Sequence, residues 1–297
     1  MIVDCQTHIW TATEQLGAGA PGRLSRENAQ EGLVASPADH AEASQCVDKT
    51  LVLGFRSAYL SAEVPNELIA EHVGRHPEAM VGVAAVDPTE PGGLAAAERC
   101  LQRDEFRGLT LSPSLQNFHP CDTRAMALYE FASGRGAPVF FSHGPHLPLL
   151  GRMDYARPFL LDEVAREFGD LTFVVSALGY PWVAECIALV AKHPRAFADV
   201  AALVRRPWIA YNALVQAYQL NVTDKLLFGS DFPYFTPARA IEAVYRMNEM
   251  VGGTNLPTVP REVLRSIVER DSLSVLGIAR AGESPAPQPI EEEQEQI

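Results

Sequence analysis

The sequence VDCQTHIW at residues 3–10 is the stretch from which the fold of this chain can be worked out. It follows the apolar Ile2 and places a carboxylate, an amide and an imidazole at every second position, in Asp4, Gln6 and His8. Because alternate residues of an extended strand share a face, we expect these three side chains to point the same way. The pattern predicts a buried strand whose C-terminal end reaches a functional site. An N-terminal strand carrying an ordinary hydrogen-bonded histidine is the alternative.

Short β-branched runs bounded by Gly or Pro recur along the chain and alternate with segments of helical periodicity. The strands are predicted at 2–6, 50–53, 81–86, 108–111, 138–142, 172–176, 196–200 and 226–229. Helices are predicted to begin near Pro37, Pro65, Gly92, Asp122, Pro158, Pro181, Pro207 and Pro237. Pro in the first turn of a helix is favourable because its missing N–H would be unpaired there anyway.

This repetition predicts an α/β fold, a closed (β/α)8 TIM barrel, because eight strand–helix units in about 280 residues match the size of that barrel. We predict a single barrel domain over residues 1–280. The main rival is an open doubly wound sheet, which normally carries G-x-G-x-x-G after its first strand. The match at 17–22, GAGAPG, lies within a long loop and not in a strand-to-helix turn, so we interpret it as flexible loop and not as a phosphate-binding turn.

Three segments lie outside the regular units. Residues 11–35 form the longest insertion, at the barrel end where active sites lie, so a lid and a plain surface excursion both remain open. Residues 261–279 are predicted to form one or two closing helices that cover the bottom or side of the barrel. The tail, 281–297, is rich in Pro and Glu and poor in core-forming residues, so we predict that it is disordered.

Charge and composition exclude several functional classes. The 297 residues carry a net charge of −13, which argues against binding nucleic acid or an anionic membrane. No apolar run approaches membrane-spanning length, and no secretion signal is recognisable. The five cysteines are scattered and never form a C-x-x-C pair, which fits a reducing cytoplasm. We expect a cytoplasmic protein with a small-molecule substrate and, as in many barrels, the possibility of a homodimer.

Five motifs together resemble one family. They are DCQTH at 4–8, VDP at 86–88, RGL at 107–109, LGYPW at 178–182 and LFGSDFP at 227–233. The first resembles the D-x-H-x-H opening of the amidohydrolase superfamily, and the others resemble its amidohydrolase-related branch. The resemblance implies a barrel that hydrolyses lactones and other cyclic esters or amides, or decarboxylates aromatic and unsaturated acids, usually around a divalent metal.

The sequence departs from this family at the metal site. Gln6 stands in place of the first histidine of the opening motif, Ala177 stands in place of the histidine of the sixth strand, and His143 comes one residue late on the fifth. Only His8 and Asp231 remain where the resemblance places metal ligands. Because a catalytic zinc site usually has three protein ligands, we favour no metal cofactor. A divalent metal such as zinc remains open, held by His8, Asp231 and His143.

Without a metal, the resemblance and the residue chemistry suggest a direct hydrolysis, and the resemblance includes lactonases that need no metal. Asp231 would be the general base for water, His8 an electrophile or acid, and Gln6 a hydrogen-bond donor to the oxyanion. The leading hypothesis is a hydrolase of a small cyclic ester (lactone) or related carboxylated metabolite. The alternatives are a barrel that has lost its chemistry and binds a ligand or partner, and a metal-dependent decarboxylase.

Five further residues are candidates for substrate binding: Arg56, His119, His143, Trp10 and Tyr180. An arginine fork pairs with a substrate carboxylate, although a surface salt bridge is the other reading. The aromatic rings would wall an apolar pocket, or would simply pack. The histidines would reach the site from the loops, or would make ordinary hydrogen bonds.

Three residues at the seventh strand stay ambiguous. Arg205 and Arg206 follow it and would either bind substrate or lie on the outside of a helix. Asp199, the last residue of that strand, is matched by an acidic residue in relatives. It would support the residues that contact the substrate without touching the substrate itself.

Overall fold

The computed structural model describes residues 1–17, 35–142 and 148–278. Within these ranges, eight parallel strands form one sheet in which each strand pairs with the next along the chain. They are β1 Val3–Thr7, β2 Lys49–Leu53, β5 Met80–Ala85, β6 Phe106–Leu111, β7 Val139–Phe141, β8 Phe173–Val175, β9 Ala196–Asp199 and β10 Leu226–Leu227. A small hairpin of β3 (Arg56–Ser57) and β4 (Ala62–Glu63) follows β2. The predicted eight-stranded barrel is confirmed.

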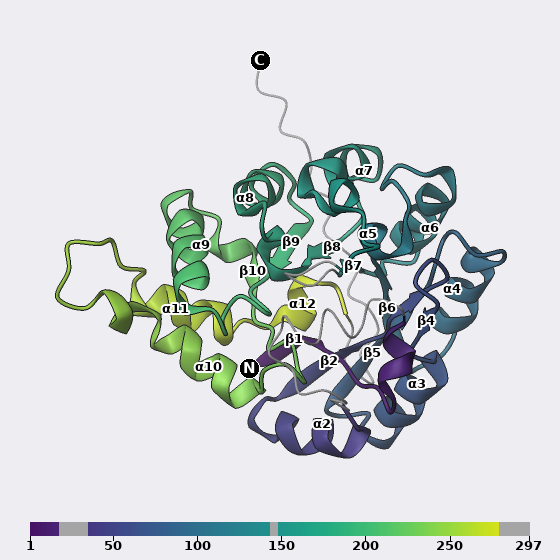
Figure 1. Cartoon of the computed structure of the whole chain (residues 1–297), viewed down its shortest axis with the longest axis horizontal. Coiled ribbons are helices and arrows are strands. Elements are labelled where there is room, and N and C mark those ends of the chain that lie inside the picture. Colours follow the sequence, from purple (N-terminus) through teal and green to yellow (C-terminus); the bar gives the residue numbers. More distant parts are fainter. Residues whose placement is uncertain (18–34, 143–147, 279–297) are drawn as a thin grey trace.

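Helices surround the strands as an outer ring (Figure 1). They are α2 Pro37–Ala43, α3 Asn66–Arg75, α4 Gly93–Leu101, α5 Pro113–Gln116, α6 Thr123–Gly134, α7 Leu161–Glu167, α8 Val183–Lys192, α9 Pro207–Gln219, α10 Pro237–Tyr245 and α11 Arg261–Val268. The last helix, α12 Ser272–Val275, does not belong to this ring. The predicted starts lie close to the observed ones, and α2, α9 and α10 each begin at the expected proline. The side chains of Ser36 and Thr236 cap α2 and α10 by accepting from backbone N–H groups.

The barrel closes where the last strand returns to the first. Asp231 N donates to Gln6 O at 3.0 Å, and His8 N donates to Phe232 O at 2.9 Å. Thr7 and Phe232 form a parallel bridge. These bonds place the segment after β10 directly beside the C-terminal end of β1. The candidate residue Asp231 therefore lies next to the backbone that carries Gln6 and His8.

Apolar side chains fill the barrel interior and are covered by the C-terminal segment. The cluster contains Val3, Cys5, Leu51, Leu53, Val83, Phe140, Val174, Phe197, Leu227, Leu273, Leu276 and Ile278. The last three belong to or follow α12, which lies at the centre of the ring of strands in Figure 1. α12 is therefore one of the predicted closing helices, whereas the buried side chains of α11 belong to the outer apolar cluster.

Two predictions fall on parts of the chain that are only partly described. The insertion at 11–35 is clamped at its base, since Trp10 and Ala35 exchange backbone hydrogen bonds of 3.0 and 3.2 Å. The rest of the proposed lid, 18–34, and the tail, 281–297, lie outside the described residues. Within the described ranges, no helix combines the length and the apolar character needed to cross a membrane.

The first strand contains an irregularity that changes which side chains share a face. Between Asp4 and Thr7 it advances three residues while β2 advances two. Such a bulge interrupts the alternation of side chains. Asp4 therefore shares its side with Thr7, whereas Gln6 and His8 share the other. Our expectation that all three polar side chains lie on one face is wrong for Asp4.

A buried chain of histidines fixes Thr7 to the helices outside it. Thr7 Oγ1 donates to Leu51 O at 2.8 Å, so it accepts from His40 Nε2, also 2.8 Å away. His40 Nδ1 then accepts from His72 Nε2 at 2.9 Å. Burial is the main cause that lowers the pKa of His40 to about 3 and that of His72 to about 4, so both rings are neutral. The chain joins β1, α2 and α3.

Candidate active site

Asp231 occupies the mouth of the barrel just after β10. Its backbone has a φ of 67°, a left-handed conformation that Asp tolerates better than most residues. The residue is 3% exposed, and its backbone N–H is held by Gln6 O. The carboxylate is thus fixed beside the end of β1.

Arg205 faces Asp231 from the segment after β9. Its Nη2 lies 3.9 Å from Asp231 Oδ2, and the arginine side chain is only 10% exposed. The guanidinium carbon lies 5.4 Å from the ring centre of Tyr234, within range of a cation–π contact. At an effective dielectric near 20, two unit charges at this distance attract by about 4 kcal/mol before desolvation is counted. The cation therefore favours an ionised Asp231.

Arg206, next in sequence, lies at the edge of the same charge cluster. Burial lowers its pKa, while Asp231 and Tyr180 oppose that change, and it remains a cation at neutral pH. Its Nη1 donates to Ala202 O at 2.8 Å. The structure thus brings Arg205 and Arg206 to the site, where the sequence left their location open. Tyr180, a predicted substrate residue, lies near enough to Arg206 to act on its charge.

His8 lies at the end of β1 with a defined tautomer. Its Nδ1 is 3.2 Å from Leu53 O. Because a carbonyl oxygen can only accept, Nδ1 carries a proton, and Nε2 holds a lone pair unless the ring is cationic. His8 can therefore take up a proton or bind a metal through Nε2 when neutral, and donates from Nε2 only as the imidazolium.

A small cavity of about 30 Å³ lies beside His8. Its lining includes Trp10, Leu115, Ser142 and Tyr234. Trp10, predicted to contact substrate, is 2% exposed, and its ring centre is 5.9 Å from that of Tyr234. The cavity is large enough for a water molecule with polar neighbours.

Gln6 is oriented by a residue that follows β8, three strands away around the barrel. Ser176, directly after β8, donates from Oγ to Gln6 Oε1 at 2.6 Å, and both residues are buried. The amide nitrogen of Gln6 carries two N–H groups and can act as a donor. Ser176 is not among the residues predicted from the sequence, although it lies two residues after Val174, whose side chain faces the barrel interior.

Two buried carboxylates lie behind this layer. Asp199 Oδ1 accepts from Ala177 N at 2.9 Å and Ala201 N at 3.0 Å. Burial is the main cause that raises the pKa of Asp199 to about 7 and that of Asp4 to about 6. Asp4 accepts from Ser230 N at 2.9 Å, one residue before Asp231. Asp4 therefore supports the backbone that carries the candidate base.

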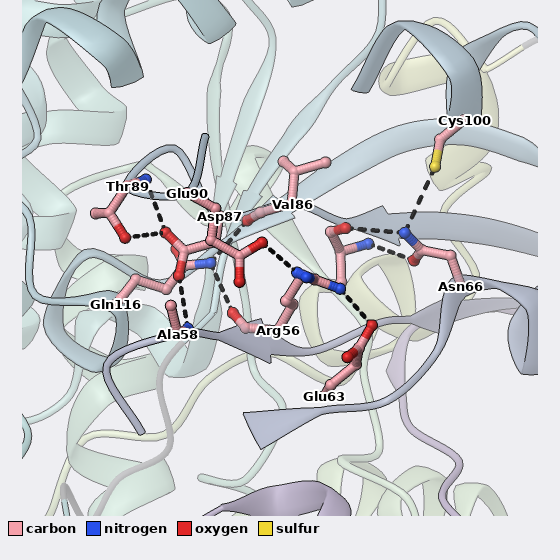
Figure 2. A network of polar contacts seen from close by, with 11 residues as sticks. Arg56, Ala58, Glu63, Asn66, Val86, Asp87, Thr89, Glu90, Cys100 and Gln116 are labelled. Carbon is pink, nitrogen blue, oxygen red and sulfur yellow. Dashed lines mark hydrogen bonds and ion pairs between the residues drawn. The ribbon is translucent and has the colours of Figure 1, made fainter. Parts of the chain in front are cut away.

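Arg56 is engaged in a polar network of its own (Figure 2). Its Nε donates to Glu90 Oε2 at 2.6 Å, and Nη1 pairs with Glu63. Gln116 Nε2 donates to the backbone oxygens of Arg56 and Val86, at 2.8 and 2.7 Å. Of the two alternatives for Arg56, the observed contacts are those of a salt bridge. Together with the Gln116 bonds, they connect the β3–β4 hairpin to the end of β5.

Of the two loop histidines predicted to bind substrate, His119 lies within the described residues. His119 is exposed, its Nδ1 accepts from Cys121 N at 3.1 Å, and its ring meets Tyr155 edge-on. It does not line the cavity beside His8. His143 lies outside the described residues.

The described residues do not fit a three-ligand metal site. In this part of the chain no group of three His, Cys, Asp or Glu side chains could hold a metal ion. His8 and Asp231 provide two donors, while Gln6 is bonded to Ser176, and the backbone N–H of Ala177 is bonded to Asp199. Two donors are fewer than a catalytic zinc site usually has.

Comparison of the sequence with known families gives one match over nearly the whole chain. The family described as "Amidohydrolase" matches residues 3–270. No curated protein matches the sequence.

Several solved structures share the fold. An uncharacterized TIM-barrel protein from Bordetella bronchiseptica is 21% identical with a TM-score of 0.69, covering 93% of this chain and 98% of its own. A probable 2-pyrone-4,6-dicarboxylic acid hydrolase from Acinetobacter baumannii is 13% identical with a TM-score of 0.66, covering 93% and 99%. A dihydroxybenzoic acid decarboxylase from Polaromonas with bound manganese is 13% identical with a TM-score of 0.63, covering 94% and 98%.

Proposed function

Because the chain belongs to the amidohydrolase family, we propose that it is a hydrolase that opens a small cyclic ester, a lactone, or a related carboxylated metabolite. The observation that carries the proposal is the position of Asp231. It is a buried carboxylate paired with Arg205 at 3.9 Å and held by backbone hydrogen bonds beside Gln6 and His8. A base, a donor and a proton-carrying ring therefore meet at one end of the barrel.

In the first step, Asp231 takes a proton from a water molecule as the water oxygen forms a bond to the ester carbonyl carbon. Arg205 keeps the carboxylate ionised beforehand. The carbonyl oxygen becomes an oxyanion, which accepts hydrogen bonds from Gln6 Nε2 and from His8 in its protonated form. The Ser176 contact orients the Gln6 amide for this role.

In the second step, the bond between the carbonyl carbon and the ring oxygen breaks. The ring oxygen leaves with the electron pair and takes the proton that Asp231 holds. The product is a hydroxy acid, and Asp231 returns to its ionised state. The nearby Arg206 would suit a second carboxylate on the substrate or the new one on the product.

The names of the structural relatives support the choice of substrate. A 2-pyrone is itself a cyclic ester, and the relative from Acinetobacter baumannii is named for its hydrolysis. The cationic pair Arg205 and Arg206 is consistent with an anionic substrate of that kind.

The test is turnover of a panel of lactones, with and without carboxylate substituents, by the wild type and by Asp231→Asn. Asp104→Asn is the matched control, since the Asp104 side chain is fully exposed. We expect Asp231→Asn to lower kcat by roughly 10²-fold or more and the control to behave as wild type. Equal turnover by wild type and Asp231→Asn would refute the role of Asp231.

Two other outcomes point to the competing functions. Release of carbon dioxide from aromatic acids, with no lactone turnover, would indicate a decarboxylase. Binding of these compounds without turnover of any would indicate a barrel that only binds its ligand.

A further inference from the structure

Asp199 is a fully buried carboxylate with only one of its two oxygens satisfied. It is 0% exposed, and its Oδ1 accepts two backbone N–H bonds from the ends of the neighbouring loops. Within the described part of the chain, Oδ2 makes no hydrogen bond. A buried carboxylate oxygen without a partner is costly when ionised. Protonation of Oδ2 would turn this unsatisfied acceptor into a donor.

Ser176 directly follows β8, the strand that pairs with the strand of Asp199, and its hydroxyl has a single hydrogen. In the structure that hydrogen is directed to Gln6 Oε1 at 2.6 Å. Ser176 and Asp199 directly follow Val175 and Ala198, which pair between β8 and β9, so the two residues lie side by side, and the Ser176 hydroxyl acts to lower the pKa of the Asp199 carboxyl. Ser176 therefore lies between Asp199 and Gln6 and can donate to only one of them at a time.

Asp199, Ser176 and Gln6 can form hydrogen bonds in two arrangements, and these differ by one proton. When Asp199 is protonated, its O–H donates to Ser176 Oγ, the Ser176 hydroxyl donates to Gln6 Oε1, and the Gln6 NH₂ is free for the substrate. When Asp199 is ionised, Ser176 donates to the carboxylate, and only the Gln6 NH₂ can supply the hydrogen bond that Ser176 Oγ then accepts. The Gln6 amide turns over, and its oxygen faces the substrate.

We propose that Asp199 is a positioning residue whose proton, passed on through Ser176, sets which end of the Gln6 amide faces the substrate. As a contribution to turnover, the inference rests on the function proposed above, because it concerns the oxyanion donor of that reaction. The geometric relay itself does not need an active enzyme.

The groups packed around Asp199 place its titration near neutral pH. Burial is the largest cause, and the neighbouring Asp4 also raises the pKa of Asp199, which reaches about 7. The thiols of Cys5 and Cys186 face it from β1 and α8, and burial raises the pKa of both, so they stay neutral. Asp4 titrates lower, with a pKa of about 6, and is bonded to Ser230.

Asp199→Asn is the informative variant. Its Oδ1 can accept the same two backbone N–H bonds, and its Nδ2 donates to Ser176 permanently, as the protonated acid would. For an active wild type, kcat/KM should fall above about pH 7 and reach a level roughly 10²-fold lower, the usual effect of losing one oxyanion donor. Asp199→Asn should keep its activity to higher pH. An alkaline fall that persists in Asp199→Asn would overturn the proposal.

The decisive experiment is an NMR titration that needs no substrate. The full-length protein carries ¹⁵N in its glutamine side chains, and the Gln6 amide signal is identified by its loss in Gln6→Met. We expect this signal to shift with a midpoint near pH 7 in the wild type and in the Asp104→Asn control, and to be insensitive to this transition in Asp199→Asn. Ser176→Ala should also abolish the response, and it serves as the comparison if Asp199→Asn does not fold.

A Gln6 signal that does not titrate in the wild type, or that titrates equally in folded Asp199→Asn or Ser176→Ala, overturns the relay. Failure of every lactone to react would instead overturn the proposed function and leave the NMR result standing.

Discussion

Replacing His40 with Gln should reveal how much the buried histidine chain contributes to stability. His40 lies between Thr7 and His72, with hydrogen bonds of 2.8 and 2.9 Å, and is 0% exposed. Burial is the largest cause that lowers its pKa from 6.5 to about 3, and the neighbouring histidines add to it. His40→Gln keeps a hydrogen-bonding side chain that cannot become charged.

The sign of the effect follows from proton linkage. Below pH 6.5 the unfolded chain binds a proton at this histidine, whereas the folded protein does not bind it until the pH approaches 3. The contribution of a neutral His40 is therefore complete above pH 6.5 and is lost as the pH falls toward 3. At about pH 5 the loss amounts to about 2 kcal/mol of unfolding free energy.

The buried acids work in the opposite direction and require a comparison between variants. Asp4 and Asp199 have raised pKa values, about 6 and 7, so acidification removes the penalty of burying their charges. They are present in both proteins, and their contributions cancel in the difference between wild type and His40→Gln as long as the sites act independently.

The assay is urea unfolding of both proteins at about pH 7.5 and about pH 5. We expect the stability advantage of the wild type over His40→Gln to shrink by about 2 kcal/mol at the lower pH. His119→Gln, at an exposed site, should show no such change. A difference between wild type and His40→Gln that is the same at both pH values would refute the reasoning.

Other substitutions test separate parts of the account. Arg205→Gln should lower kcat/KM by roughly 10- to 100-fold because it removes the cation beside Asp231. Arg205→Lys keeps the charge but loses the guanidinium contact with Tyr234, so its kcat/KM should lie between those of the wild type and Arg205→Gln. Steady-state kinetics would show this order, and an unchanged kcat/KM in Arg205→Gln would contradict it. Gln116→Leu leaves three backbone groups, two of them buried, without the bonds that Gln116 provides, so we expect its unfolding free energy to drop by about 3 kcal/mol, measured in urea. The exposed Gln219→Leu is its control, and similar stabilities for the two variants would argue against the network of Figure 2.

Much of the fold could be predicted because the barrel repeats one local pattern. Each strand is a short apolar run, and several helices begin at a proline, so eight units could be recognised without knowing their contacts. The bulge between Asp4 and Thr7 could not be predicted in this way. It depends on the register against β2, which becomes defined only when the strands pair.

The candidate site was predictable in part. The motif at 227–233 indicated Asp231, and the opening strand indicated Gln6 and His8, since each belongs to a local pattern. The pairing of Arg205 with Asp231 and the contact between Ser176 and Gln6 join segments far apart in the sequence, and no periodicity indicates them. For Arg56, the sequence suggested a role that the observed contacts do not require. Its residue type suited a substrate carboxylate, but its glutamate partners became visible only in the folded hairpin.

The most direct test of the central claim is the turnover of a lactone by protein treated with a chelator, with metal content and kcat/KM measured on the same sample. The account predicts that the metal-free wild type retains its activity and that Asp231→Asn, treated in the same way, loses roughly 10²-fold or more. Activity that disappears on chelation and returns with added zinc, or equal activity in the two proteins, would contradict it.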